Sequence, residues 1–267
     1  MGNVVVGISS LVATPLLPIL WLQGRQVRRQ TPRLPEAAGP TIGTVPGTGD
    51  ALRLLVIGES TVAGVGAPDH EQALTGQIAA SLAARTGRTV HWHAIGRIGV
   101  TAHGARTLLV SRVPDAPVDI IVIALGVNDV LQFHSPARWT RDVTHLIADV
   151  RKRVGPASVV LASVPPMGRF PAFPQPLRGV LGLRASALDR ALKRAVAMFP
   201  QVAHSPTRLD PAEDLFGADR FHPSVRGYLR WGTQIAESAL SLLMSSQRAA
   251  QQRAAPDGRP TSAGGRG

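Results

Sequence analysis

Three short motifs, far apart in the sequence, contain the side-chain types that cleave an ester. Ser60 ends a Gly-Glu-Ser segment and supplies a hydroxyl, while His222 supplies an imidazole with Asp219 three residues before it. Asn128, in a Gly-Val-Asn-Asp segment, adds a side-chain amide. A hydroxyl nucleophile, an imidazole base, a carboxylate that orients the base and amide donors for an oxyanion are sufficient for acyl transfer through a covalent intermediate.

Each motif taken alone also has a plain structural explanation. A serine after Gly-x can cap a helix, a histidine before proline can be a surface residue, and Asn-Asp after glycine suits a turn. The Gly-x-Ser-x-Gly elbow of α/β-hydrolases is absent, because position 62 is Val62. The functional interpretation therefore depends on where the three motifs lie relative to strands and helices.

The segment between the motifs alternates strand and helix patterns. Continuous apolar runs predict buried strands, and apolar residues at helical spacing predict the helices between them. Unbroken apolar strands in such an alternation indicate a central parallel five-stranded sheet with helices on both faces, a three-layer α/β/α sandwich. The predicted strands are 52–57, 89–95, 118–125, 158–164 and 201–204, and the predicted helices follow Asp69 or span 135–153, 183–199 and 224–244.

The motifs occupy the positions at which such a sheet binds its ligands. Ser60 follows the first predicted strand, Asn128 follows the third, and His222 precedes the last helix. Because ligands of parallel sheets bind at the carboxyl ends of the strands, we expect the three residues to meet at one edge.

In this order on a parallel α/β pattern, the motifs resemble blocks I, III and V of the SGNH hydrolase superfamily, also called GDSL esterases and lipases. The block II glycine matches Gly99, with Gly96 as the alternative. The resemblance covers roughly residues 52–245 and implies a flavodoxin-like SGNH hydrolase fold.

The resemblance also implies a role for each residue. Ser60 is the nucleophile, His222 the general base and later acid, and Asp219 the orienting carboxylate. The backbone N–H groups of Ser60 and Gly99 and the side-chain amide of Asn128 form the oxyanion hole. Glu59 stands where the family name has aspartate, and we expect it to alter local hydrogen bonding without altering the chemistry.

The implied function is a serine esterase for short to medium acyl or acetyl groups. A thioesterase, a carbohydrate O-deacetylase and an acyltransferase would use the same residues, and a catalytically silent binding protein is the alternative outside enzymes. Phe170 and Phe173, in a proline-rich stretch from 164 to 182, are expected to form an apolar lip that contacts the acyl chain. The alternative is that this stretch is only a rigid surface connection.

Composition excludes several other functions. The absence of cysteine among 267 residues excludes a disulfide, a thiolate nucleophile and a cysteine-based metal site. We expect no cofactor and no metal, and we interpret His91 and His93 as ordinary strand residues. Half of the net charge of +12 lies in residues 1–40 and 248–267 and one tyrosine is present, so we expect a small-molecule or lipid ester substrate and no nucleic acid.

The ends of the chain differ from its centre. Residues 1–24 contain an uncharged run at 4–22 and are interpreted as a membrane anchor or signal segment. We assign 25–50 to a linker, 51–246 to the catalytic domain and 247–267 to a disordered tail. Because arginines follow the uncharged run and none precedes it, membrane association with a cytoplasmic catalytic domain is expected, and export after signal cleavage is the alternative. The sequence does not indicate the oligomeric state.

Overall fold

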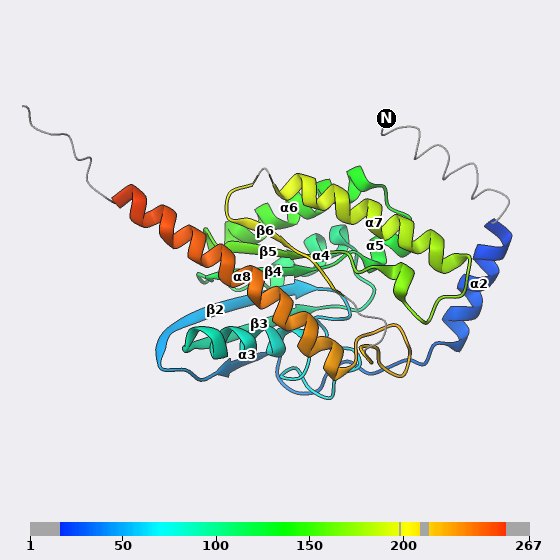
Figure 1. The fold of residues 1–267 in the computed structure, drawn as a ribbon, viewed down its shortest axis with the longest axis horizontal. Coiled ribbons are helices and arrows are strands. Elements are labelled where there is room, and N and C mark those ends of the chain that lie inside the picture. The colour runs from blue at the N-terminus through cyan, green and yellow to red at the C-terminus, as the bar shows by residue number, and fades with distance from the viewer. Residues whose placement is uncertain (1–16, 198, 209–213, 255–267) are drawn as a thin grey trace, which may run out of the picture.

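The computed structural model describes residues 17–197, 199–208 and 214–254, and it forms a sheet between two layers of helices (Figure 1). Strands and helices alternate along the chain, as the apolar periodicity predicts. The strands are β1 (Ile42–Val45), β2 (Gly49–Gly58), β3 (Arg88–Gly96), β4 (Ile120–Ala124), β5 (Ser158–Ala162) and β6 (Val202–Ser205). The α-helices are α2 (Leu17–Gln30), α3 (Leu74–Thr86), α4 (Ala102–Leu108), α5 (Val127–Leu131), α6 (Pro136–Val154), α7 (Leu177–Val196) and α8 (Val225–Ala254), with 3-10 turns at Val110–Arg112 and Met167–Arg169.

The five predicted strands form a parallel sheet in the order β3-β2-β4-β5-β6. A sixth strand, β1, pairs antiparallel with β3 at the edge, within the segment that the sequence assigned to a linker. Four residues are too few for a recognisable apolar run. β1 instead depends on its ladder with β3 and on Gly43, where an added Cβ would lie 2.3 Å from the Trp92 ring. The α/β/α class is confirmed, with one more strand than predicted.

Alternating side chains of the central strands enter two separate cores. Leu55 and Ile57 of β2 join one apolar cluster with α4, α6 and α7, while Leu54 and Val56 join the other with α3 and α8. Side chains of a strand point alternately to opposite faces, so a strand that is apolar throughout requires helices on both sides. This burial fixes the register of β2, and therefore the position of the residues that follow it.

Helix termini follow local sequence signals where those signals are strong. The Ser135 side chain accepts a hydrogen bond from Arg138 N at 3.2 Å and caps α6, as expected. Asp69 accepts from Gln72 N at 2.8 Å, but this pair closes a turn that precedes α3, whose N-cap is Ala73. The capping-box pattern thus predicts a real turn and places the helix start too early.

The two ends of the described chain are helical. α2 includes the end of the predicted anchor and the start of the predicted linker, and the rest of the uncharged run lies outside the described residues. Among the described residues, no helix has the length and apolar character needed to cross a bilayer. α8 continues to Ala254, past residue 247 where a disordered tail was expected. The rest of that tail lies outside the described residues.

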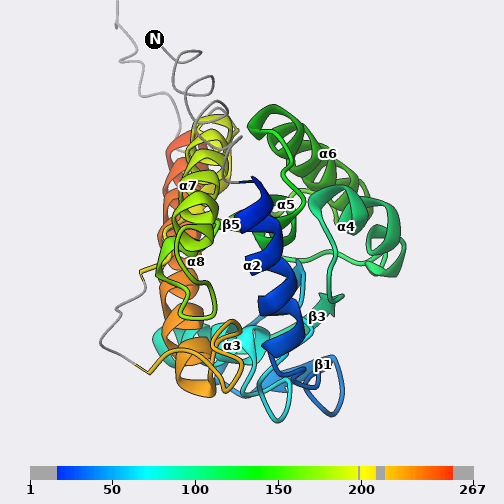
Figure 2. The same cartoon turned by 90° about the vertical axis from the view of Figure 1, so that its right-hand side faces the viewer.

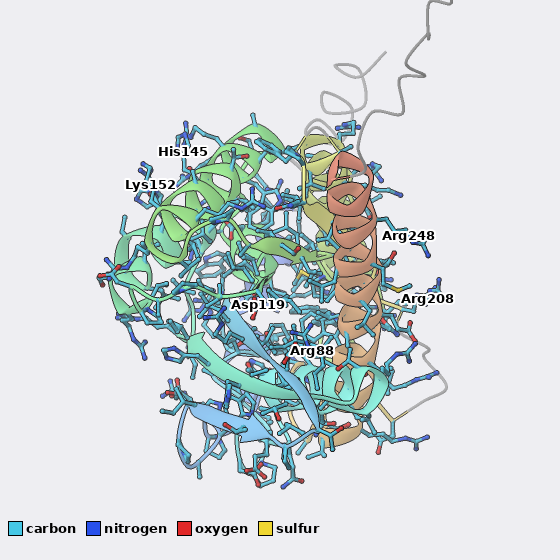
Figure 3. All side chains as sticks on the ribbon, turned by 90° about the vertical axis from the view of Figure 1, so that its left-hand side faces the viewer. Arg88, Asp119, His145, Lys152, Arg208 and Arg248 are labelled. Carbon is cyan, nitrogen blue, oxygen red and sulfur yellow. The ribbon has the colours of Figure 1, made fainter. Side chains whose placement is uncertain are left out.

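The side of the molecule that is on the left in Figure 1 carries charged side chains from several elements (Figure 3). Arg88 belongs to β3, Lys152 to α6 and Arg248 to α8. Asp119, just before β4, accepts from the backbone N–H of Arg53 at 2.8 Å and pairs with its side chain at 3.3 Å. These contacts join neighbouring strands at their amino ends, away from the edge to which the motifs were assigned.

Candidate active site

Ser60 lies in a tight turn directly after β2. Gly58 ends the strand, and a Cβ there would lie 2.3 Å from the carbonyl oxygen of Ala124, so only glycine permits this close approach of β2 and β4. The Glu59 carbonyl accepts from Val62 N at 3.0 Å, which closes a single helical turn over the serine. Regular helix begins only at Leu74. Ser60 is 8% exposed, so its hydroxyl is held at the bottom of a recess.

Asp219 and His222 lie on a compact turn before α8. The Gly217 N–H donates to the carbonyl of His222 at 2.8 Å, and Arg220 adopts a left-handed conformation with φ of 58° to close the turn. The Asp219 Oδ1 atom accepts from the backbone N–H groups of Phe221 at 3.0 Å and His222 at 2.9 Å. The three-residue spacing therefore lets the carboxylate hold both the backbone and the ring of the histidine.

The three side chains form one hydrogen-bonded chain across 162 residues of sequence. Asp219 Oδ2 lies 2.6 Å from His222 Nδ1, and His222 Nε2 lies 3.0 Å from Ser60 Oγ. An ionised carboxylate only accepts, so Nδ1 carries the proton and Nε2 is free to accept from the serine hydroxyl. Burial alone would raise the pKa of Asp219, but hydrogen bonds from the His222 ring and from backbone N–H groups outweigh burial and lower it.

Strand order places the other two predicted residues on either side of Ser60. β2 is paired with β3 on one side, where Gly58 lies opposite Gly96, and with β4 on the other, where it lies opposite Ala124. The loop with Gly99 follows β3, and Asn128 follows β4 in α5. The turn that carries Ser60 thus starts between the two loops that were predicted to supply oxyanion donors.

The glycines after β3 have different structural requirements. At Gly96 an added Cβ would lie 2.2 Å from Ala63 N, so this glycine is required by the close packing of the nucleophile turn. Gly99 has a positive φ of 76° and open space around its Cα. In the part of the chain that the structure describes, the N–H groups of Ser60 and Gly99 donate to no acceptor. Gly99 therefore remains the better match to the predicted donor.

Asn128 differs from these two because its amide protons already have acceptors. Its Nδ2 donates to Glu59 Oε2 and, at 3.1 Å, to the carbonyl oxygen of Val100. The backbone N–H groups of Val127 and Asn128 also donate to the Glu59 carboxylate, each at 3.1 Å. Glu59 thus fastens the loop after β4 to the nucleophile turn.

Glu59 is the residue that the sequence interpretation undervalued. It is 4% exposed, and burial raises its pKa to about 8, although the N–H donors of Val127 and Asn128 oppose the rise. Asp129 raises it further by charge repulsion. The signal was a carboxylate directly after a fully apolar strand, a position that requires partners.

Asp129 itself supports the loop from the other side. It is fully buried, and it accepts from Ala102 N at 3.0 Å and faces His134 Nδ1 at 2.8 Å. These contacts join the start of α4 to the end of α5, as a structural carboxylate would.

A small apolar cavity of about 50 Å³ opens beside Ser60 and His222. Phe170 is among its lining residues, together with Phe216 and Phe221. Phe173 stacks behind Phe170 with ring centroids 6.1 Å apart and is not in the cavity wall. Both predicted lip residues are 5% exposed and belong to the core. The structure places Phe170 at the site and Phe173 behind it.

A second, larger cavity of about 410 Å³ lies between β6 and α8 and is lined by His204, Arg208 and Glu237 among others. It contains none of the predicted site residues. We place the site at the smaller cavity, because that is where the His222 imidazole and the Ser60 hydroxyl are in hydrogen-bond contact. Among the described residues, no group of three or more histidine, aspartate or glutamate side chains could hold a metal ion.

Comparison with known proteins gives consistent results. The model described as "GDSL-like Lipase/Acylhydrolase family" matches residues 56–230. The GDSL-like esterase Rv1075c of Mycobacterium tuberculosis (strain ATCC 25618 / H37Rv) is 29% identical over 184 residues, which are 66% of this chain and 58% of that relative. The chain thus spans less than two thirds of that relative's length.

Two solved structures show the same fold at low identity. The lipase Lip_vut3 from a goat rumen metagenome has a TM-score of 0.59 at 19% identity and covers 70% of this chain and 97% of its own. Est24, a carbohydrate acetylesterase from Sinorhizobium meliloti, has a TM-score of 0.57 at 20% identity. The match covers 72% of this chain and 99% of Est24.

The matched segment 56–230 is more than half of the chain, and it includes the hydrogen-bonded Ser60, His222 and Asp219 together with both neighbouring loops. The chain belongs to the GDSL-like lipase/acylhydrolase family.

Proposed function

We propose that this protein is a serine esterase for short acyl esters, with Ser60, His222 and Asp219 as its catalytic triad. The observation that carries the proposal is the continuous chain from Asp219 Oδ2 to His222 Nδ1 at 2.6 Å and from His222 Nε2 to Ser60 Oγ at 3.0 Å. A serine that merely capped a helix would need no base in contact with its hydroxyl.

The geometry supports the following reaction. His222 Nε2 takes the Ser60 proton as Oγ attacks the acyl carbon, and Asp219 stabilises the imidazolium that forms. His222 then gives the proton to the leaving alcohol as the C–O bond breaks. Water, deprotonated by the same nitrogen, releases the acyl group from Ser60 and restores the enzyme.

The oxyanion is proposed to be held by the N–H groups of Ser60 and Gly99 and by Asn128 Nδ2. The first two have no acceptor among the described residues and are ready to donate. Asn128 must give up one of its present acceptors, Glu59 or Val100. Glu59 keeps two backbone donors if it loses the amide, so we expect the Asn128–Glu59 bond to be the one that exchanges.

The cavity size supports a short acyl group. A volume of about 50 Å³ has room for roughly three to four water-sized groups, which suits acetyl or propionyl better than a long chain. Walls formed by Phe170 and Phe221 make the cavity apolar, as an alkyl group requires. The same size fits a carbohydrate O-deacetylase, the second candidate, and Est24 is a carbohydrate acetylesterase on this fold. A thioesterase and an acyltransferase use the same triad.

The test is the Ser60→Ala variant on p-nitrophenyl acetate and p-nitrophenyl hexanoate. We expect a loss of at least about 10⁴-fold in turnover, because the nucleophile is gone. A fluorophosphonate label followed by peptide mapping should mark Ser60 in the wild type and no residue in the variant.

A matched control distinguishes the loss of a nucleophile from the loss of a helix cap. Ser135→Ala removes the serine that caps α6 and should lower stability by about 1 kcal/mol while leaving turnover unchanged. Equal rates for wild type and Ser60→Ala would refute the esterase proposal. A panel of acetylated sugars, acyl thioesters and competing alcohols then separates the three related reactions.

A further inference from the structure

Helix α2 exposes an unusual set of side chains on the surface that faces away from the domain. Its first two turns carry Leu17, Trp21 and Leu22 at 55%, 59% and 59% exposure, while Leu20 between them is buried. Exposed apolar groups gathered on one element indicate an interaction surface. Helical spacing places the members of this surface, here called the α2 outer face, on two adjacent stripes: Leu17, Pro18, Trp21, Leu22, Arg25, Arg28 and Arg29.

The α2 outer face changes from apolar to basic along the helix axis. The arginines Arg25, Arg28 and Arg29 are exposed in the second half, and α2 contains no acidic residue. The Arg25 guanidinium lies over the Trp21 ring, 4.6 Å from its centroid, at the boundary between the two halves. Residues 1–24 contain no charged side chain, so Arg25 is the first one in the sequence.

The inner face attaches α2 to the loops that surround the candidate active site. Gln23 Nε2 donates to the carbonyl of Gln175 at 2.7 Å, and Gln23 Oε1 accepts from Leu177 N at 3.1 Å. Both partners follow the aromatic segment that contains Phe170. Figure 2 shows α2 in dark blue crossing the side of the molecule at which α8 begins.

The segment after α2 is attached to the nucleophile turn as well. The carbonyl of Pro35 accepts from Gly66 N at 3.2 Å, and Ala37 N donates to the carbonyl of Ala63 at 3.1 Å. The helix is therefore held from both directions, by the segment that follows Phe170 and by the turn that carries Ser60. Its outer face has a fixed orientation relative to the cavity.

We propose that the α2 outer face binds the surface of an anionic phospholipid bilayer and holds the active-site edge of the domain next to that surface. An apolar half that inserts among acyl chains, tryptophan at the boundary and arginines at the phosphate level match the layers of a membrane interface. A helix that binds in this way lies in the plane of the membrane interface and does not cross the bilayer. Where substrates are concerned, the inference rests on the proposed esterase function and favours esters that reside in or near membranes.

Charge decides between this occupant and the others. A second copy of this chain would bring a net charge of +12 toward a surface that is itself basic, and like charges oppose association. Anionic lipid attracts each arginine near its surface. For three arginines together, this attraction strengthens binding about 100-fold.

The probe is a set of large unilamellar vesicles, either phosphatidylcholine alone or phosphatidylcholine with phosphatidylglycerol. Trp21 is an intrinsic reporter, because the other three tryptophans, Trp92, Trp139 and Trp231, are 8% exposed or less. With the full chain, we expect flotation with the anionic vesicles and quenching of Trp21 emission by brominated lipids. Equal binding to both vesicle types, or no quenching, would overturn the proposal.

Two variants and their matched controls locate the contact. Replacing Arg25, Arg28 and Arg29 together by glutamine should lower binding to anionic vesicles about 100-fold. The control replaces Arg190, Lys193 and Arg194, three exposed cations in the last turns of α7, and should have little effect. Undiminished binding in the α2 triple variant would mean that another part of the chain holds the membrane, and would refute a role for α2.

The apolar half is tested in the same way. Trp21→Ser with Leu22→Ser should reduce binding by at least about tenfold through lost apolar burial, whereas Met244→Ser, an exposed position on α8, should not. Self-association at micromolar concentration that these two serines abolish would assign the surface to a second copy instead.

The last comparison separates this inference from the proposed function. Vesicle binding should persist in Ser60→Ala, and the α2 variants should retain full turnover of water-soluble p-nitrophenyl acetate. With a fluorogenic ester embedded in anionic vesicles, the α2 triple variant should lose rate in proportion to its lost binding. Unchanged rates on the embedded ester would refute the orientation of the site toward the bilayer, whatever the result with soluble esters.

Discussion

Asp219 and Glu59 are both buried carboxylates beside the Ser60 turn, 3% and 4% exposed, yet their pKa values move in opposite directions. Each accepts two backbone N–H groups and one side-chain N–H. The main difference lies in the balance with burial, which outweighs the N–H donors at Glu59 and is outweighed by them at Asp219. His222 can become a cation, while the Asn128 amide is always neutral, and Asp129 adds a negative charge near Glu59.

The comparison shows that similar surface exposure and equal numbers of hydrogen bonds do not give equal charge. Burial disfavours an ionised carboxylate in both places, and at Asp219 the hydrogen bonds from the His222 ring and from two backbone N–H groups outweigh this effect. In the proposed reaction, the Asp219 side of the site stabilises the positive charge that develops on His222. The Glu59 side is built to hold a loop, and it tolerates a proton on its carboxyl group.

The largest expected effect is that of Asp219→Asn. Losing the carboxylate removes the acceptor that fixes the His222 tautomer, so turnover of p-nitrophenyl acetate should fall about 10⁴-fold with the fold intact. Glu59→Gln, the matched change on the other side, keeps one of the two oxygens that accept from Val127 and Asn128 and leaves the Asp219–His222 pair unchanged, so it should cost much less. Comparable losses in the two variants would contradict the division of roles between the two carboxylates.

Asn128→Ala should have the next largest effect, a loss of about 10²–10³-fold in turnover, if its amide holds the oxyanion. The KM should change little, because the interaction strengthens only as the charge develops. Gln132→Ala, at the C-terminal end of the same short helix, is a suitable control. A normal turnover number in Asn128→Ala would limit this side chain to binding Glu59 and Val100.

Stability as a function of pH should show both carboxylates with opposite slopes. The folded-state pKa of Glu59, about 8, is above its unfolded value of 4.5, so its contribution is present in full below about pH 4.5 and is lost as pH rises to about 8. The contribution of Asp219, whose pKa is lowered, is present above its unfolded value of 3.8 and is lost as pH falls.

Thermal unfolding from pH 3 to pH 9 measures these slopes. Glu59→Gln should flatten the decline in stability above pH 4.5, a decline worth up to a few kcal/mol. Asp219→Asn should flatten the loss of stability at acid pH. Asp115→Asn removes an exposed carboxylate and should change neither limb. A decline between pH 5 and pH 8 that survives in Glu59→Gln would show that another group causes it.

The smallest effect is expected at the cavity that both sides share. Phe170→Leu keeps most of the buried volume and should cost about 1 kcal/mol of unfolding free energy. Because a smaller side chain widens a cavity of about 50 Å³, the preference among C2 to C12 esters should move toward longer chains. Phe173→Leu, one layer behind, should show the stability loss alone. An identical chain-length preference in both variants and the wild type would remove Phe170 from the acyl pocket.

Sequence reasoning located the strands and the hydrogen-bonded residues Ser60, His222 and Asp219 because both sets follow local patterns. Apolar runs predicted all five parallel strands, and Asp-x-x-His-Pro predicted a turn in which the carboxylate of Asp219 reaches the ring of His222. It missed β1, whose four residues are ordered by pairing with β3, and it began α3 at Asp69, where a turn precedes the helix. It also assigned Phe173 to the site, although packing places that ring behind Phe170.

The sequence by itself determined the chemical inventory of this protein, namely which residues could act and that each follows a strand or precedes a helix. The tertiary structure decided which of them touch, because only the order β3-β2-β4 places the loops of Gly99 and Asn128 on the two sides of Ser60. It also decided their electrostatics. A pKa depends on burial and on neighbours brought from distant segments, so the opposite behaviour of Glu59 and Asp219 is visible only in the folded molecule.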